Sequence, residues 1–179
     1  MLNHYAINKE IERGSIYVDG AQDKLGANFI YVTLGDSIKI YDSPSLDVRN
    51  SMPTEEYPIP ESGFVIMPRV CYIGATFEFT KTYGFVPVLN EDDRLAVLGL
   101  KSHITAGFGD NGFEGTWTLE IEGAIPVRLF PYMPIGTLYY NPLIGDGGVL
   151  YRGKYFGQIA PTESRLSEEY GESRVRRKC

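Results

Sequence analysis

Cysteine is scarce in this 179-residue sequence, which contains only Cys71, within an apolar run, and Cys179, the last residue. Two cysteines so far apart supply neither a disulfide framework nor the clustered thiolates of a zinc site. Free thiols are typical of a reducing compartment, so we expect a cytoplasmic protein.

Long hydrophobic runs are also absent, and no stretch approaches the roughly 18 apolar residues that a membrane-spanning helix needs. The polar N-terminal segment MLNHYAINKEIERG has no apolar core of a secretory signal peptide. We therefore expect neither membrane insertion nor secretion.

Positive charge is scarce as well, since the formal net charge is −6 at pH 7. The basic cluster RVRRKC at the C-terminus follows an acidic stretch and is interpreted as a solvated tail, with a weak anion or RNA contact as the alternative. Proteins that bind nucleic acid broadly present a basic surface, so the charge argues against nucleic acid as a partner.

The sequence is rich in residues that form short strands and the turns between them, including 20 glycines and 11 prolines. One short helix is predicted at residues 7–13, because Ile7 and Ile11 share a face and Gly14 follows as a stop. Runs rich in β-branched and aromatic residues then predict strands: NFIYVTL, SIKIY, GFVIMP, CYIGATFEF, YGFVPVL, SHITA, TWTLEIE, IPVRLF and GTLYYNPL. Many short strands indicate a mainly β sandwich or barrel.

The whole chain, residues 1–179, is predicted to form one domain, because its length suits a single core and no internal repeat is visible. Residues 42–62 are polar and proline-rich, and neither flanking half could form a good core alone. We interpret them as a long loop or arm within the domain.

Three ordered blocks of the sequence resemble dCTP deaminases. Residues 98–121, LGLKSHITAGFGDNGFEGTWTLEI, resemble the family's motif LGL-x-x-H-x-TAGFIDPGF-x-G, which precedes a strand carrying LE. Residues 131–138, PYMPIGTL, resemble its PGM-x-IG-x-L turn and strand, and residues 153–166, GKYFGQIAPTESRL, resemble its KYQGQ-x-x-PT-x-SR tail. Three blocks in the right order make the resemblance specific.

The resemblance implies the distorted jelly-roll-like fold of dCTP deaminases and trimeric dUTPases, assembled as a homotrimer with active sites at subunit interfaces. The C-terminal lid and tail, residues 153–179, would close over a bound pyrimidine deoxynucleotide. That nucleotide would arrive with Mg²⁺ on its phosphates, and the resemblance implies neither zinc nor another metal bound by the protein itself.

Glu120 is the central catalytic candidate and lies in the strand-like run TWTLEIE, where apolar and polar residues alternate. By resemblance it is the general base and acid of deamination. A carboxylate near C4 of cytosine deprotonates a water and then passes the proton to the leaving ammonia. We expect partial burial to raise its pKa. The structural alternative is a solvent-facing glutamate on an edge strand.

Asp110 and Phe113 lie in the glycine-rich segment GFGDNGFEG. By resemblance, Asp110 binds the 3′-hydroxyl of deoxyribose, or orients the attacking water in a dUTPase, and Phe113 packs on the sugar. Thr105 and Ala106 would place backbone groups beside the base. The alternative for the loop is an ordinary Asp-Asn-Gly turn, and His103 is interpreted as a packed structural residue.

The C-terminal segment carries further candidates. The resemblance assigns Lys154 and Gln158 to contacts with phosphate and the closed lid, and Tyr155 to a position near the base. Arg165 could add a second phosphate contact. A mobile segment that carries a cation can clamp an anion and exclude water, whereas a frayed polar C-terminus is the alternative.

The sequence departs from the family pattern at residues 91–100, where EDDRLAVLGL stands in place of GRSSLARLGL. Asp92 replaces a phosphate-binding arginine, Asp93 replaces a serine that positions the catalytic water and the base, and Val97 replaces a further arginine. Two carboxylates near a triphosphate would repel it. Arg94 could restore positive charge and is retained as a substrate-binding candidate. Such divergence is typical of virus-encoded copies.

The leading functional hypothesis is therefore a dCTP deaminase that converts dCTP and water to dUTP and ammonia, with Glu120 as general base and acid. A dUTPase, or an enzyme that performs both steps, is the first alternative. A non-catalytic nucleotide-binding or structural trimer of the same fold is the second, and the acidic segment at 91–94 favours it.

Overall fold

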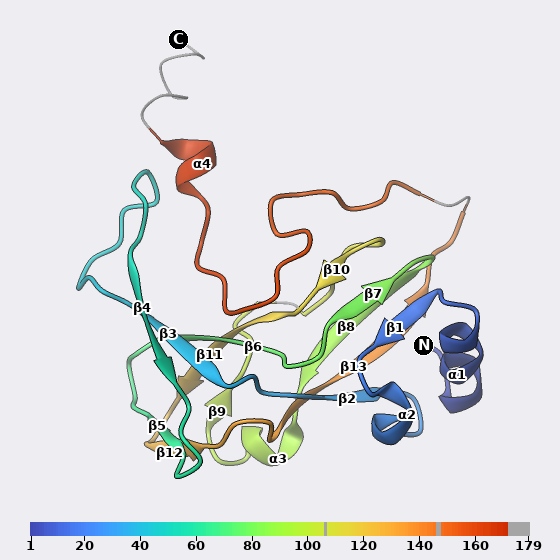
Figure 1. Cartoon of the computed structure of the whole chain (residues 1–179), viewed down its shortest axis with the longest axis horizontal. Coiled ribbons are helices and arrows are strands. Elements are labelled where there is room, and N and C mark those ends of the chain that lie inside the picture. The colour runs from blue at the N-terminus through green and yellow to red at the C-terminus, as the bar shows by residue number, and fades with distance from the viewer. Residues whose placement is uncertain (106, 146–147, 172–179) are drawn as a thin grey trace.

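The computed structural model describes residues 1–105, 107–145 and 148–171, which form a mainly β fold with a few short helices (Figure 1). The helices are α1 (His4–Glu12), α2 (Ala21–Lys24), α3 (Asp93–Ala96) and α4 (Ser167–Tyr170). The strands are β1 (Ile16–Val18), β2 (Ile30–Thr33), β3 (Ser37–Tyr41), β4 (Thr54–Pro58), β5 (Phe64–Ile66), β6 (Tyr72–Ala75), β7 (Thr80–Thr82), β8 (Phe85–Glu91), β9 (Leu100–Lys101), β10 (Glu114–Gly115), β11 (Thr118–Gly123), β12 (Val127–Leu129) and β13 (Pro134–Pro142). The predicted mainly β class and N-terminal helix are confirmed.

The strands form small antiparallel sheets. Their orders are β1-β7-β10, β4-β3-β6-β11-β9, β12-β5 and β2-β13-β8. Neighbouring strands in these orders are often far apart in the sequence, so the sheets are held together by long-range pairing. The central five-stranded sheet places β11 between β6 and β9. This interior strand carries the catalytic candidate predicted from the sequence.

One strand prediction is wrong. The run SHITA was expected to be a strand, but Ser102–Thr105 form none, since the N–H groups of Ser102 and His103 donate to a carboxylate instead of a neighbouring strand. The segment 42–62, predicted to be a long loop or arm within the domain, contains β4, which pairs with β3 along residues 37–41. The exposure of β4 explains why its sequence shows no apolar face.

Helix α1 begins three residues before the predicted start. The side chain of Asn3 accepts a hydrogen bond from the N–H of Ala6 at 3.0 Å and so caps the helix. Ile7 is fully buried and Ile11 packs against the core, as their spacing predicts. Gly14 follows with φ of 76°, a left-handed conformation that glycine adopts without strain.

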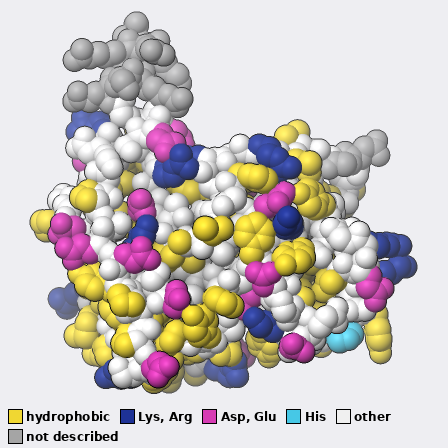
Figure 2. Space-filling model, in the orientation of Figure 1, with side chains coloured by type: hydrophobic (Ala, Val, Ile, Leu, Met, Phe, Trp, Pro, Cys, Tyr) yellow, Lys and Arg dark blue, Asp and Glu magenta, His cyan; other side chains and the backbone are white. Residues whose placement is uncertain are grey.

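The C-terminal segment crosses the molecule after β13 and runs above β10 and β11 toward α4 (Figure 1). Backbone hydrogen bonds fix this path: Tyr151 N–H donates to Asn111 at 2.8 Å, and Gly157 N–H donates to Glu114 at 2.8 Å. On the face shown in Figure 2, hydrophobic side chains gather near the middle, and the charged side chains of both signs are interspersed around them.

Candidate active site

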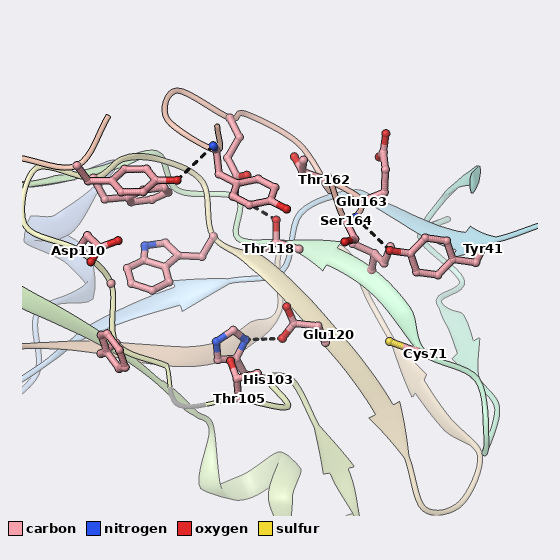
Figure 3. A pocket seen from close by; sticks show the side chains of 18 residues that line it. Tyr41, Cys71, His103, Thr105, Asp110, Thr118, Glu120, Thr162, Glu163 and Ser164 are labelled. Atoms are coloured by element: carbon pink, nitrogen blue, oxygen red, sulfur yellow. Dashed lines mark hydrogen bonds and ion pairs between the residues drawn. The ribbon is translucent and has the colours of Figure 1, made fainter. Parts of the chain in front are cut away.

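A cavity of about 470 Å³ lies between β11, the loop after β9 and the C-terminal segment (Figure 3). That volume is in the range of small-molecule sites. The lining residues are Tyr41, Cys71, Ile73, His103, Thr105, Phe108, Gly109, Asp110, Phe113, Trp117, Thr118, Glu120, Tyr151, Tyr155, Gln158, Thr162, Glu163 and Ser164. Six of the residues predicted from the sequence thus meet in one cavity: Thr105, Asp110, Phe113, Glu120, Tyr155 and Gln158.

Strand β11 presents Glu120 to the cavity because alternate residues of a strand face opposite sides. Leu119 and Ile121 are buried in the core, whereas Thr118 and Glu120 line the cavity. Glu120 pairs in register with Ile73 of β6. β11 pairs with β6 along residues 118–121 and with β9 at residues 122–123, so it is an interior strand of the sheet, although Glu120 itself pairs only with β6.

His103 contacts the candidate base directly. Its Nδ1 lies 2.7 Å from Oε2 of Glu120, and the N–H of Ile104 donates to the same oxygen at 3.4 Å. Burial raises the pKa of Glu120, but the hydrogen bond and charge of His103, together with backbone hydrogen bonds that include the one from Ile104, outweigh it, so this pKa lies below its usual value. The expected rise in the pKa is therefore wrong, and the carboxylate is ionised at neutral pH.

The contact of His103 with Glu120 is the main feature of the site that the sequence does not predict. The sequence analysis interprets this residue as a packed structural histidine. Its side chain is 15% exposed and the Glu120 side chain is 33% exposed, so the pair is partly shielded but reaches the cavity. The sequence feature that could have pointed to this contact is that His103 is the only ionisable side chain in residues 102–105, which follow β9.

Asp110 lies at the opposite end of the cavity from Tyr41 (Figure 3). Phe113 N–H donates to the Asp110 carbonyl at 3.1 Å, and Gly112 has φ of 85°, so the segment forms a tight turn. The ring of Phe113 packs edge-on against Trp117, with centroids 5.6 Å apart. The turn presents both Asp110 and Phe113 to the cavity, and their roles as ligands of a sugar stay a prediction.

Thr105 is exposed and lines the cavity from the loop after β9. Its predicted companion Ala106 lies outside the described residues. So do the basic cluster at residues 174–179 and, within it, Cys179.

The C-terminal segment, which lines the cavity between Tyr151 and Ser164 and is called the roof below, docks onto two strands. Gln158 Nε2 donates to the Thr116 carbonyl at 2.8 Å and to the Thr118 hydroxyl at 3.1 Å, while Thr116 N–H donates to the Gln158 carbonyl at 2.9 Å. Farther along, Lys39 of β3 pairs with Glu163 at 2.9 Å. Residue 158 therefore anchors the roof to β11, and residue 163 anchors it to β3.

Two tyrosine hydroxyls complete the roof. Ser164 N–H donates to the Tyr41 hydroxyl at 3.1 Å, and Arg165 N–H donates to the Tyr155 hydroxyl at 3.0 Å. Tyr41 and Cys71 line the same end of the cavity (Figure 3). No local motif marks Tyr41, because its partner lies 123 residues away in the sequence.

Two predicted phosphate ligands lie elsewhere. Lys154 pairs with Glu169 and donates to the Arg165 carbonyl at 3.1 Å. Arg94 pairs with Asp92 at 2.6 Å and borders a second cavity of about 530 Å³. Among the described residues, no lysine or arginine lines the cavity of Glu120.

Asp92 is a helix cap. Its carboxylate accepts from the backbone N–H of Arg94 at 3.0 Å and from Nε of the same residue at 2.9 Å, at the N-terminus of α3. The residue is only 4% exposed. The hydrogen bond from Arg94 lowers the pKa of Asp92. The repulsion expected from this carboxylate is therefore offset locally, since its charge is paired within the chain.

Within the part of the chain that the structure describes, no three His, Cys, Asp or Glu side chains gather closely enough to hold a metal ion. We assign none of these side chains as a metal ligand. None of the described helices is long and apolar enough to span a membrane.

Comparison with known families gives one assignment for most of the chain. A family model described as "dCTP deaminase-like" matches residues 1–143. A Clostridium botulinum protein named "dCTP deaminase, dUMP-forming" is 36% identical over 155 residues, which are 87% of this chain and 90% of that protein. A Leptospira biflexa protein of the same name is 37% identical over 146 residues, which are 82% of this chain and 84% of that protein.

A solved structure supports the fold. The 2′-deoxycytidine 5′-triphosphate deaminase from Agrobacterium tumefaciens superposes with a TM-score of 0.62 at 14% identity. The match covers 79% of this chain and 48% of that one. At this identity the likeness concerns the arrangement of strands alone.

Proposed function

This chain belongs to the dCTP deaminase-like family, and we propose that it hydrolyses dCTP to dUMP, ammonia and diphosphate. The substrate is the one named in its relatives, as the sequence hypothesis expected. The product in the leading hypothesis was dUTP, whereas these relatives are named for dUMP. We therefore adopt the alternative in which one enzyme performs both hydrolytic steps.

The first step in this proposal is deamination at C4 of the cytosine ring. The ionised carboxylate of Glu120 takes a proton from a water, and the water oxygen forms a bond to C4. The carboxyl then returns the proton to the exocyclic amine, the C4–N bond breaks, and ammonia leaves. His103 stabilises the ionised form at the start of the cycle because it lies 2.7 Å from the carboxylate.

The second step releases diphosphate from the dUTP formed in the first. We propose that Asp110 orients a second water toward the α-phosphorus; the new P–O bond forms as the bond to the β-phosphate oxygen breaks. Overall, dCTP and two waters give dUMP, ammonia and diphosphate. The location of Asp110 and Glu120 at different positions along one cavity supports separate roles for the two carboxylates.

Mg²⁺ enters this proposal as part of the substrate, bound to the phosphates of the nucleotide. We also propose a homotrimer in which a neighbouring copy supplies positive charge. The absence of lysine and arginine from the described lining of the Glu120 cavity supports that arrangement, because a triphosphate needs cations near it.

The contact between His103 and Glu120 within a nucleotide-sized cavity is the observation that carries the proposal. The test is a turnover and thermal-shift panel with dCTP, dUTP, dCMP and dUMP in the presence of Mg²⁺, with products separated by ion-exchange chromatography. We expect dCTP to yield dUMP and ammonia in equal amounts. If none of the four nucleotides reacts, the proposal is overturned and a non-catalytic role of the fold takes its place.

A further inference from the structure

The carboxylate of Glu91 lies at the end of β8, beside the loop that carries His103. Its Oε1 accepts hydrogen bonds from two consecutive backbone groups, the N–H of Ser102 at 3.0 Å and the N–H of His103 at 3.2 Å. One side-chain oxygen thus satisfies two consecutive backbone N–H groups and fixes the start of this loop.

The same strand also holds the end of the loop. Leu89 N–H donates to the Gly107 carbonyl at 2.7 Å, and Val88 forms an isolated bridge with Phe108. The loop that follows β9 is thus held to β8 at both ends. His103, whose own N–H belongs to the first of these anchors, contacts Glu120 from there.

The resemblance of EDDRLAVLGL to the family pattern GRSSLARLGL implies that Glu91 stands in place of a glycine, which carries no side chain to accept a hydrogen bond. In the same segment, Asp93 stands in place of a serine to which the resemblance assigns the positioning of the catalytic water and the base. A new acceptor thus appears next to the place where a positioning hydroxyl has been lost.

We propose that Glu91 is a positioning residue for the reaction described above: it holds the backbone of residues 102–103 so that His103 stays in contact with Glu120. The inference rests on the proposed function for its effect on turnover, but the geometry it concerns can be tested without substrate. Small displacements of a catalytic group lower the rate steeply, because the reacting atoms need close alignment. Glu91 acts through His103 and does not itself line the cavity of Glu120.

The variants are Glu91→Ala, Glu91→Gln and a matched control, Asp19→Ala. The amide oxygen of glutamine can still accept both N–H groups, whereas alanine cannot. Asp19 is a fair control because its carboxylate also accepts a backbone N–H, that of Phe79 at 3.1 Å, and it lies on none of the cavities described above. Thermal unfolding of each variant establishes that it is folded before turnover is compared.

Steady-state kinetics with dCTP provide the first readout. We expect Glu91→Ala to lower kcat by about 10- to 100-fold with a smaller change in KM. Glu91→Gln should recover most of the loss, and Asp19→Ala should keep the kcat of the unaltered protein. A Glu91→Ala variant with unchanged kcat, or one in which glutamine restores nothing, would overturn the positioning role.

Histidine NMR provides the second readout, because the chain contains only two histidines. His4 bonds to the Gly26 carbonyl at 2.9 Å, a contact that involves neither Glu91 nor the backbone groups that Glu91 binds, and serves as the internal reference. In Glu91→Ala, the ring signals of His103 should shift toward their positions in Glu120→Gln, with those of His4 unchanged. If the His103 signals do not move, the proposal fails even when the protein is active. If they move and no variant or parent turns over dCTP, the proposed function fails and the positioning stands.

Discussion

His103 Nδ1 lies 2.7 Å from Glu120 Oε2, which joins the loop after β9 to the central strand β11. The contact, with the backbone hydrogen bonds to the same carboxylate, opposes the effect that burial has on the pKa of Glu120. Burial favours the neutral acid, whereas a hydrogen bond and a nearby positive charge favour the ionised form. Their balance lowers the pKa of Glu120, so its carboxylate is available as a base over a wide pH range.

Replacing His103 with glutamine should therefore move the acid limb of the pH profile. The lowered pKa of Glu120 means that the parent loses activity only when the pH falls below the usual range of a glutamate. Without the histidine, burial remains and the pKa rises, so activity should be lost at higher pH. The measurement is kcat for deamination as a function of pH. An acid limb that stays in place would show that His103 does not tune this carboxylate.

Replacing Glu120 with glutamine should abolish deamination while the fold persists. The amide cannot exchange a proton with the water or with ammonia, and general acid–base catalysis typically contributes about 10²- to 10⁴-fold. Ammonia release from dCTP should fall by at least that factor, and the thermal unfolding midpoint should change little because the side chain is partly exposed. Normal ammonia release from this variant would remove Glu120 from the mechanism.

Replacing Asp110 with asparagine should separate the two hydrolytic steps. The variant keeps the turn, because the hydrogen bond that closes it uses the Asp110 backbone carbonyl. It loses the carboxylate that we assign to orienting water at the α-phosphorus. We expect dUTP to accumulate from dCTP in place of dUMP, as followed by ion-exchange chromatography. Continued formation of dUMP at the parent rate would mean that another group orients this water.

The fold and part of the site were predictable because their signals are local. The alternation of residues in TWTLEIE gives the strand β11 and the face on which Glu120 lies. The glycine-rich segment around Asp110 gives a turn, and both candidates reach the same cavity. The strand β11 and the turn at Asp110 could thus be predicted because both depend on residues that are close together in the sequence.

The missed features depend on contacts that no local pattern encodes. The carboxylate of Glu91 competes with strand pairing for the N–H of Ser102, which is why the β-branched run SHITA forms no strand. Tyr41 reaches the cavity only through the docking of the C-terminal segment. The acidic residue Asp92 was read as exposed to a phosphate, whereas burial and pairing with Arg94 make it a helix cap.

The cap at Asp92 leads to a prediction about stability. Loss of an N-cap costs about 0.5–2 kcal/mol in the free energy of unfolding, and the buried Asp92 carboxylate also loses its pairing with the exposed Arg94. Asp92→Ala should therefore lower stability, and Asp92→Asn, which can still cap, should lower it less. The lowered pKa of Asp92 means that its contribution is present above the usual aspartate range and is lost as pH falls through the folded-state value.

Urea denaturation of the parent and of both Asp92 variants at neutral and acidic pH measures this contribution. The difference in unfolding free energy between the parent and Asp92→Ala should shrink as the pH falls. A difference that is independent of pH would indicate that the ionised carboxylate contributes nothing, and that the loss comes from packing alone.

Tyr41→Phe tests whether the roof of the cavity matters for substrate binding. The substitution removes the hydroxyl that accepts the Ser164 N–H at 3.1 Å, but keeps the ring at the end of the cavity. A single hydrogen bond contributes about 0.5–1.5 kcal/mol, which corresponds to an increase in KM for dCTP of about 2- to 10-fold.

Tyr57→Phe is the matched control, since the Tyr57 hydroxyl bonds to Glu55 on β4 and lies outside the cavity. Because the Tyr41 hydroxyl binds the C-terminal segment and has no contact with Glu120, kcat should change less than KM in Tyr41→Phe. Equal behaviour of the two phenylalanine variants would mean that the Tyr41 hydroxyl is not needed to hold this segment over the cavity.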